Sequence, residues 1–197
     1  NLLGGMIWTL MAPLVATFGG ASDLGIAISA GGGGMLLGGA IMLYWGGPKR
    51  LSLGILGSIA FQGIILMATT PLMSLWPLVL CMVGAGMTFP VILGCNDALW
   101  QRKVPPDIQG KVFSFRPLFA GIPLAISILI SGPLADYVFE PMMREGSPAA
   151  VVLGPFFGTG EGRGIAVLLF MLGALCVLLA LGGLMNKSIR QADILLK

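Results

Sequence analysis

Long apolar stretches separated by short polar connections dominate the chain. Six of them cover roughly residues 2–18, 24–45, 51–69, 75–99, 112–135 and 164–184. A helix needs about 20 mostly apolar residues to cross the hydrocarbon of a bilayer, and each stretch is near that length. Residues 166–184 (AVLLFMLGALCVLLALGGL) are apolar on every side, whereas barrel strands alternate in polarity. The pattern predicts an all-α membrane protein in which residues 1–197 form one domain of six transmembrane helices.

Basic side chains outnumber acidic ones in every second connection. The basic connections carry Lys49 and Arg50; then Arg102, Lys103, Lys111 and Arg116; and finally Lys187, Arg190 and Lys197. Cytoplasmic loops collect lysine and arginine, so this alternation predicts that both termini are cytoplasmic. We expect the membrane to be a bacterial-type inner (plasma) membrane. Asn1 follows no basic leader, and we expect the chain to be a segment that starts just inside a helix.

Two segments outside the apolar stretches are predicted to lie along the membrane. Residues 137–163 form a long external connection whose run AAVVLGPFFG is too short to span. We expect this connection to lie at the interface, anchored by Phe156 and Phe157. The tail, residues 185–197, places Ile189, Ala192 and Leu196 on one helical face, which predicts a short helix on the cytoplasmic surface.

The composition excludes most catalytic and cofactor chemistry. Hydrophobic residues make up 56% of the chain and charged residues 10%, and there is no histidine. The three cysteines are far apart, so no zinc, haem, Cys-x-x-Cys or His-dependent catalytic motif can be built. We therefore expect no enzyme activity, no metal and no cofactor. The net charge of +3 is spread over several loops, so nucleic acid is not an expected partner.

Glycines in the second apolar stretch predict a close helix crossing. Gly34 and Gly38 form a small-xxx-small pair, and Gly31 lies one turn earlier on nearly the same face. Two helices can approach closely where side chains are missing, and dispersion then holds them together. The interface could slide or rock during function, or it could be a static tight crossing, because both use the same contacts.

Asp97 and Arg116 stand near the cytoplasmic ends of two consecutive, antiparallel apolar stretches. Their side chains are therefore expected at similar depth, and we interpret them as a pair that latches the cytoplasmic side in one state. The alternatives are that both side chains reach toward the interface, or that Asp97 pairs with Lys103.

Candidate cavity residues are apolar or weakly polar: Trp8, Met11, Thr88, Phe89 and Asn96. A cavity with this lining suits a hydrophobic or amphipathic small molecule, since sugars and phosphates need many more donors and charges. The alternative is that these aromatic and methionine side chains only pack against neighbouring helices.

The connections resemble a known transporter family. The segment NDALWQRKVPPDIQGKVFSFR (residues 96–116), followed by SGPLADYVFEPMM (residues 131–143), is similar to the C-terminal half of major facilitator superfamily transporters of the drug and macrolide efflux-like branch. Each half of such a transporter is a six-helix bundle of 3+3 inverted repeats. The resemblance implies that the first and fourth helices line a central cavity, while the second and fifth meet an N-terminal six-helix half.

The resemblance also implies a gating loop and a transport activity. WGGPKRLSLG (residues 45–54) corresponds to the family's G-x-x-x-D-R-x-G-R-R motif; Gly46, Lys49 and Arg50 fit it loosely, and the aspartate is missing. The implied function is proton-coupled export of hydrophobic small molecules, with the proton site supplied by the other half. The alternative is a free-standing six-helix scaffold or accessory subunit of a larger membrane complex.

Overall fold

The computed structural model describes residues 1–186, which form helices joined by short connections. The longer helices are α1 (Leu2–Ala16), α2 (Ala21–Trp45), α3 (Leu51–Thr69), α4 (Leu75–Lys103), α5 (Pro106–Leu134) and α8 (Arg163–Met185). The shorter elements are the 3-10 helix η1 (Thr70–Leu72), the π-helix η2 (Ala135–Phe139), α6 (Glu140–Met142) and α7 (Pro148–Phe157). Residues 1–186 contain no strand, so the all-α class is confirmed for the part described. The predicted tail helix with Ile189, Ala192 and Leu196 lies outside the described residues.

Five helices within residues 1–186 are long and apolar enough to cross a membrane. They are α2, α3 with η1, α4, α5 continued through α6, and α8. Helix α5 begins at Pro106, earlier than the apolar stretch predicted from residue 112. Proline suits the first helical position because its missing N–H would have no partner there. Residues 107–111 are therefore the first turns of a helix and not part of a loop.

Helix α1 is shorter than the others. Its 15 residues, with Pro13 inside, span only about 22 Å at 1.5 Å per residue, against about 30 Å of hydrocarbon. The prediction of a sixth membrane-crossing helix over residues 2–18 is therefore not confirmed by this helix.

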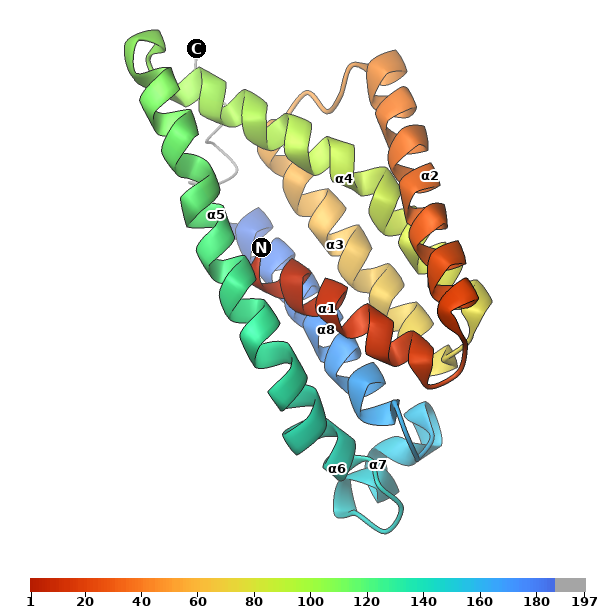
Figure 1. Cartoon of the computed structure of the whole chain (residues 1–197). Helices are drawn as coiled ribbons and strands as arrows, with labels where there is room; N and C mark the ends of the chain where they lie inside the picture. Colours follow the sequence, from red (N-terminus) through yellow and green to blue (C-terminus); the bar gives the residue numbers. More distant parts are fainter. Residues whose placement is uncertain (187–197) are drawn as a thin grey trace.

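The connections gather at two opposite ends of the bundle (Figure 1). The α2–α3 and α4–α5 connections, which carry Lys49, Arg50, Arg102 and Lys103, lie at one end, called here the basic end. The other connections, with α6 and α7, lie at the opposite end (Figure 1). Between the ends, α2 packs along α4, α3 packs against both α4 and α8, and α1 packs against α5 and α8.

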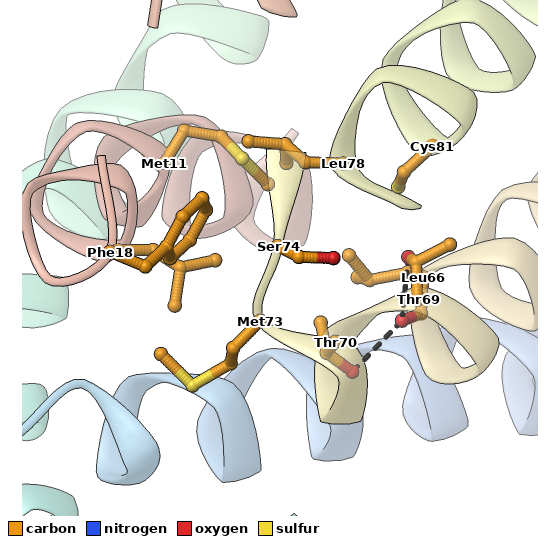
Figure 2. A pocket seen from close by; sticks show the side chains of 10 residues that line it. Met11, Phe18, Leu66, Thr69, Thr70, Met73, Ser74, Leu78 and Cys81 are labelled. Atoms are coloured by element: carbon orange, nitrogen blue, oxygen red, sulfur yellow. Dashed lines mark hydrogen bonds between the residues drawn. The ribbon is translucent and has the colours of Figure 1, made fainter. Parts of the chain in front are cut away.

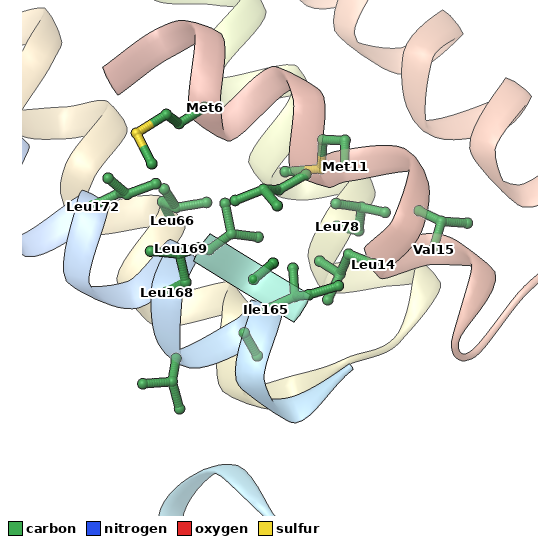
Figure 3. Packing of buried hydrophobic residues seen from close by; sticks show 14 of the residues in the cluster. Met6, Met11, Leu14, Val15, Leu66, Leu78, Ile165, Leu168, Leu169 and Leu172 are labelled. Carbon is green, nitrogen blue, oxygen red and sulfur yellow. The ribbon is translucent and has the colours of Figure 1, made fainter. Parts of the chain in front are cut away.

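The buried core lies between α1, α3, α4 and α8 (Figure 3). Leu10 of α1 and Leu169 of α8 are among its most buried members, and Leu66 and Leu78 join it from the facing ends of α3 and α4. Helix α8 contributes the most, since the core includes six of its residues: Ile165, Ala166, Val167, Leu168, Leu169 and Leu172. These residues lie toward the opposite end, so that end of the bundle is the most tightly held together.

Many large apolar side chains point outward instead. Leu36 and Leu43 of α2 are 78% and 89% exposed, and Leu129 of α5 is 74% exposed. A bundle with such an outer surface is stable when hydrocarbon surrounds it, because its backbone polar groups are satisfied within the helices.

The predicted external connection, residues 137–163, is mostly helical. Phe157 is only 4% exposed and packs edge-on against Phe156 and Phe170, with ring centroids 5.0 and 5.2 Å apart. The prediction that Phe157 anchors this segment in lipid is therefore wrong, because the ring is enclosed between α7 and α8. Phe156 remains 62% exposed.

Candidate functional site

The crossing of α2 and α4 depends on glycine. A Cβ atom added at Gly34 would lie 2.4 Å from the carbonyl oxygen of Val83, and one added at Gly38 would lie 2.1 Å from that of Met87. Both neighbouring atoms belong to the backbone, which cannot change rotamer to relieve the overlap as a side chain can. These two glycines therefore set the distance between the helices at this crossing.

The close approach is reciprocal. A Cβ added at Gly86 of α4 would lie 2.2 Å from the carbonyl oxygen of Gly31. A Cβ at Gly31 itself would lie 3.6 Å from the Met82 carbonyl oxygen, which is ordinary contact. The structure thus places Gly31, Gly34 and Gly38 on the face toward α4, and it adds Gly86, which the sequence reasoning missed. Glycine on a partner helix becomes recognisable only once the pairing of α2 with α4 is known.

Asp97 and Arg116 form an ion pair between α4 and α5. The Arg116 Nη1 atom lies 2.5 Å from Asp97 Oδ1, and the two side chains are 22% and 49% exposed for Arg116 and Asp97 respectively. The guanidinium carbon also lies 5.8 and 5.9 Å from the ring centroids of Trp100 and Phe113. These rings restrict the rotation of the Arg116 side chain, and the restriction favours its pairing with Asp97.

The α2–α3 connection lies at the same basic end. It begins with Gly46 and Gly47, whose φ angles of 77° and 80° favour glycine, and it exposes Lys49 and Arg50. A Cβ at Gly54 of α3 would lie 2.4 Å from the Cγ of Pro48, so the connection folds back tightly onto α3. The candidate gate residues Lys49 and Arg50 are thereby held beside the start of α3. Their role in gating stays a prediction.

Trp8 and Met11 share one apolar hollow. It has a volume of about 90 Å³ and is lined from α1, α2 and α4 by Trp8, Met11, Ala12, Leu24, Ala27, Ile28, Leu78 and Met82. Trp8 is 62% exposed, while Met11 is only 5% exposed and also belongs to the buried core. A second, much smaller hollow of about 10 Å³ lies nearby, where Met11 and Phe18 face Leu66 and Thr70 (Figure 2). Neither lining carries a charge, so the larger hollow suits a small apolar group.

The other cavity candidates lie elsewhere on α4. The Thr88 hydroxyl accepts a hydrogen bond of 2.7 Å from Gln62 Nε2 and donates one of 2.9 Å to the Ala85 carbonyl oxygen. Thr88 is thus engaged with α3. Phe89 is 42% exposed and Asn96 is partly buried, and neither lines either of these two hollows. Gln62, which was not predicted as a site residue, could have been suspected as an amide within an apolar helix.

Glu140 joins α6 to the start of α8. Its Oε2 accepts a hydrogen bond of 3.2 Å from the Gly162 N–H, and its Oε1 accepts one of 3.1 Å from the Ile165 N–H. The first N–H groups of a helix lack intrahelical partners and favour negative charge. A Cβ at Gly164 would lie 2.4 Å from the Phe139 carbonyl carbon and oxygen, so the two segments are in backbone contact. Nothing in the sequence indicated these hydrogen bonds, because Glu140 is more than twenty residues away from Gly162 and Ile165.

Known proteins resemble about half of this chain. Macrolide efflux protein A of Streptococcus pyogenes is 30% identical over 107 residues, which is 53% of this chain and 26% of that protein. Macrolide efflux protein A of Enterococcus faecalis is 30% identical over 97 residues, which is 48% of this chain and 30% of that protein. The matches thus span less than a third of the length of these curated relatives. No model of a protein family matches the chain, and no solved structure matches it.

The apolar helices and these relatives agree on the broad class. Five helices in the described part of the chain can cross a bilayer, and the relatives are named as efflux proteins. The chain is an integral membrane protein.

Proposed function

We propose that this chain is the C-terminal six-helix half of a secondary active transporter that exports hydrophobic or amphipathic small molecules. The proposal rests on the similarity to macrolide efflux protein A over about half the chain. The uncharged lining around Trp8 and Met11 supports apolar cargo, because a sugar or a phosphate would lack partners there.

The pattern of helix pairing supports a 3+3 inverted repeat. Suppose that α1, α2 and α3 of the first triplet are equivalent to α4, α5 and α8 of the second, in that order. The contact of α1 with α5 is then equivalent to the contact of α4 with α2, and the contact of α3 with α8 joins two equivalent helices. The α3–α4 contact likewise corresponds to the α8–α1 contact. Every main contact between these six helices therefore has its counterpart, as expected for two related triplets with opposite orientations.

Transport in this proposal proceeds by alternating access. The basic end faces the cytoplasm, as the distribution of lysine and arginine favours. The half pairs with an N-terminal six-helix half, the cargo moves between them, and protons are exchanged through an acid in that other half.

Drug accumulation in living cells tests the proposal. We expect bacteria that express the complete polypeptide to accumulate less radiolabelled macrolide than cells without it, and an uncoupler of the proton gradient to abolish the difference. Equal accumulation in both strains, for macrolides and for other hydrophobic drugs, would contradict drug export.

A free-standing scaffold or accessory subunit is the second candidate. The incomplete gating motif at residues 45–54 favours it, because a latch without its aspartate is weakened. The intact mass of the purified polypeptide, with peptide sequencing across Asn1, separates the two candidates. A mass near twice 20.4 kDa with further apolar spans upstream supports the half-transporter, and a mass near 20.4 kDa supports the scaffold.

Exchanging the charges of Asp97 and Arg116 tests the gate. We expect Asp97→Arg and Arg116→Asp each to lower the export rate about fivefold, since a coupling of about 1 kcal/mol shifts a conformational equilibrium by that factor. The double exchange restores the pair and should recover most of the rate. Stability should change little, because pairs this exposed contribute about 1 kcal/mol or less.

Lys103→Glu is the matched control for the charge exchange. It changes charge at the same basic end but leaves the Asp97–Arg116 pair intact, so export should stay near that of the unaltered protein. If the double exchange recovers nothing that the single changes lose, the pair does not latch the gate.

A further inference from the structure

Helix α7 has an exposed face without a single polar side chain. Val151 and Val152 are 73% and 75% exposed, and Phe156 is 62% exposed. At 100° per residue the exposed positions share one arc of about 140°, which leaves the buried Ala150 and Phe157 on the other side. The exposed arc consists of Pro148, Val151, Val152, Pro155 and Phe156. We call this arc the α7 face.

The α7 face is held in a fixed direction relative to the spanning helices. Arg163 of α8 donates a hydrogen bond of 2.5 Å from Nη1 to the Phe157 carbonyl oxygen. The Ser147 hydroxyl accepts a 3.1 Å hydrogen bond from the Ala150 N–H and caps the helix start. With the ring of Phe157 enclosed as well, α7 cannot turn to bury its exposed arc without breaking these contacts.

The surroundings of the α7 face identify what covers it. The Phe156 ring lies 6.0 Å from the ring of Phe170, so the α7 face continues into the outer surface of α8, where Met171 is 54% exposed. The charged side chains nearest in sequence, Glu145 and Glu161, are exposed and stand before and after the helix. At a bilayer interface, apolar side chains face the hydrocarbon and charged side chains face the water. The α7 face is continuous with a spanning helix and is flanked by charges, so it fits such an interface.

We propose that the α7 face inserts into the lipid interface of the membrane leaflet at the end opposite the basic end. Ten residues are too few to cross the bilayer, so the helix lies along its surface. This proposal requires only that the chain is embedded in a membrane, and it is independent of what the protein transports. Insertion would fix the height of the α5–α8 connection in the membrane through the Phe156 and Phe170 rings.

Spin labelling tests the proposal in the complete protein. The three cysteines of this chain, Cys81, Cys95 and Cys176, are buried, so Val152→Cys adds one reactive position to it, and the unaltered complete protein measures the labelling at every other cysteine. After reconstitution into vesicles of phosphatidylethanolamine and phosphatidylglycerol, we expect the label to collide more often with dissolved oxygen than with a polar nickel chelate. Its depth should be about 5–10 Å below the headgroup boundary. Phe156→Cys should give the same result.

Glu161→Cys is the matched control, because it lies in the same connection and outside the α7 face. Its label should collide mainly with the nickel chelate. Two results would overturn the proposal. A label at Val152 that behaves like the control would place the face in water. Low collision with both reagents would mean that protein covers it, and magnetic broadening between labels would identify a second copy of the chain.

Discussion

Replacing Gly38 with valine is expected to force α2 away from α4 and to destabilise the whole bundle. The new Cβ would meet the Met87 carbonyl oxygen at 2.1 Å, and a backbone atom within a helix can move only if the helix moves. Overpacking of this kind costs about 1–3 kcal/mol. For a chain of this length, each kcal/mol corresponds to about 2–4 °C in unfolding temperature. Thermal unfolding in detergent, followed by tryptophan fluorescence, measures the shift.

Gly39→Val is the matched control for this prediction. It places the same β-branched residue on the same helix, but its Cβ would meet nothing within 4 Å. The difference between the two variants therefore isolates the helix contact from the intrinsic helix propensity of valine. Gly31→Ala, at 3.6 Å from its nearest neighbour, should also be tolerated. Equal losses at Gly38 and Gly39 would contradict a crossing that is fixed by glycine.

A smaller substitution at the same position, Gly38→Ala, shows whether the crossing moves during function. If α2 slides along α4 during transport, Gly38→Ala should slow export more than it lowers the unfolding temperature. If the crossing is static, export and stability should fall together. Measuring the export rate and the unfolding temperature of Gly38→Ala therefore distinguishes a sliding or rocking interface from a static tight crossing.

The position of charged side chains along the bundle was predictable from the sequence, because it follows from the length of each apolar stretch and the placing of charges. The distances of Asp97 and Arg116 from the charged connection placed both side chains near one end of neighbouring helices, and the structure has them in contact. The glycine face toward a neighbouring helix was also predictable, since Gly34 and Gly38 are one helical turn apart. In both cases a local pattern carries the information.

Lateral neighbours were not predictable, because an apolar helix shows no polar face to mark its direction. Thr88 accepts a hydrogen bond from Gln62 on α3, and nothing in the sequence indicated this partner. Phe156 and Phe157 are adjacent and chemically identical, and only the docking of α7 on α8 makes one exposed and the other buried. Such choices depend on contacts between segments distant in sequence.

Removing the Glu140 carboxylate is expected to loosen the start of α8 from the end of α5. The carboxylate accepts hydrogen bonds from two N–H groups, those of Gly162 and Ile165. Hydrogen bonds to charged groups contribute about 1.5–3 kcal/mol when they are shielded, and Glu140 is partly buried, so we expect Glu140→Ala to cost on the order of 2–3 kcal/mol. The unfolding temperature should fall by about 4–12 °C. Local opening of α8 should also be visible as faster amide hydrogen exchange at residues 162–166.

Two further variants show whether the carboxylate itself is responsible. Glu140→Gln keeps one carbonyl acceptor but loses the charge that the helix N-terminus favours, so it should recover only part of the loss. Glu161→Ala removes an exposed acid from the same connection and should leave the unfolding temperature unchanged. Because Gly164 contacts the backbone at Phe139, some contact between the segments persists in Glu140→Ala, and the exchange should accelerate without full unfolding. If Glu140→Ala and Glu161→Ala behave alike, backbone packing alone joins α6 to α8.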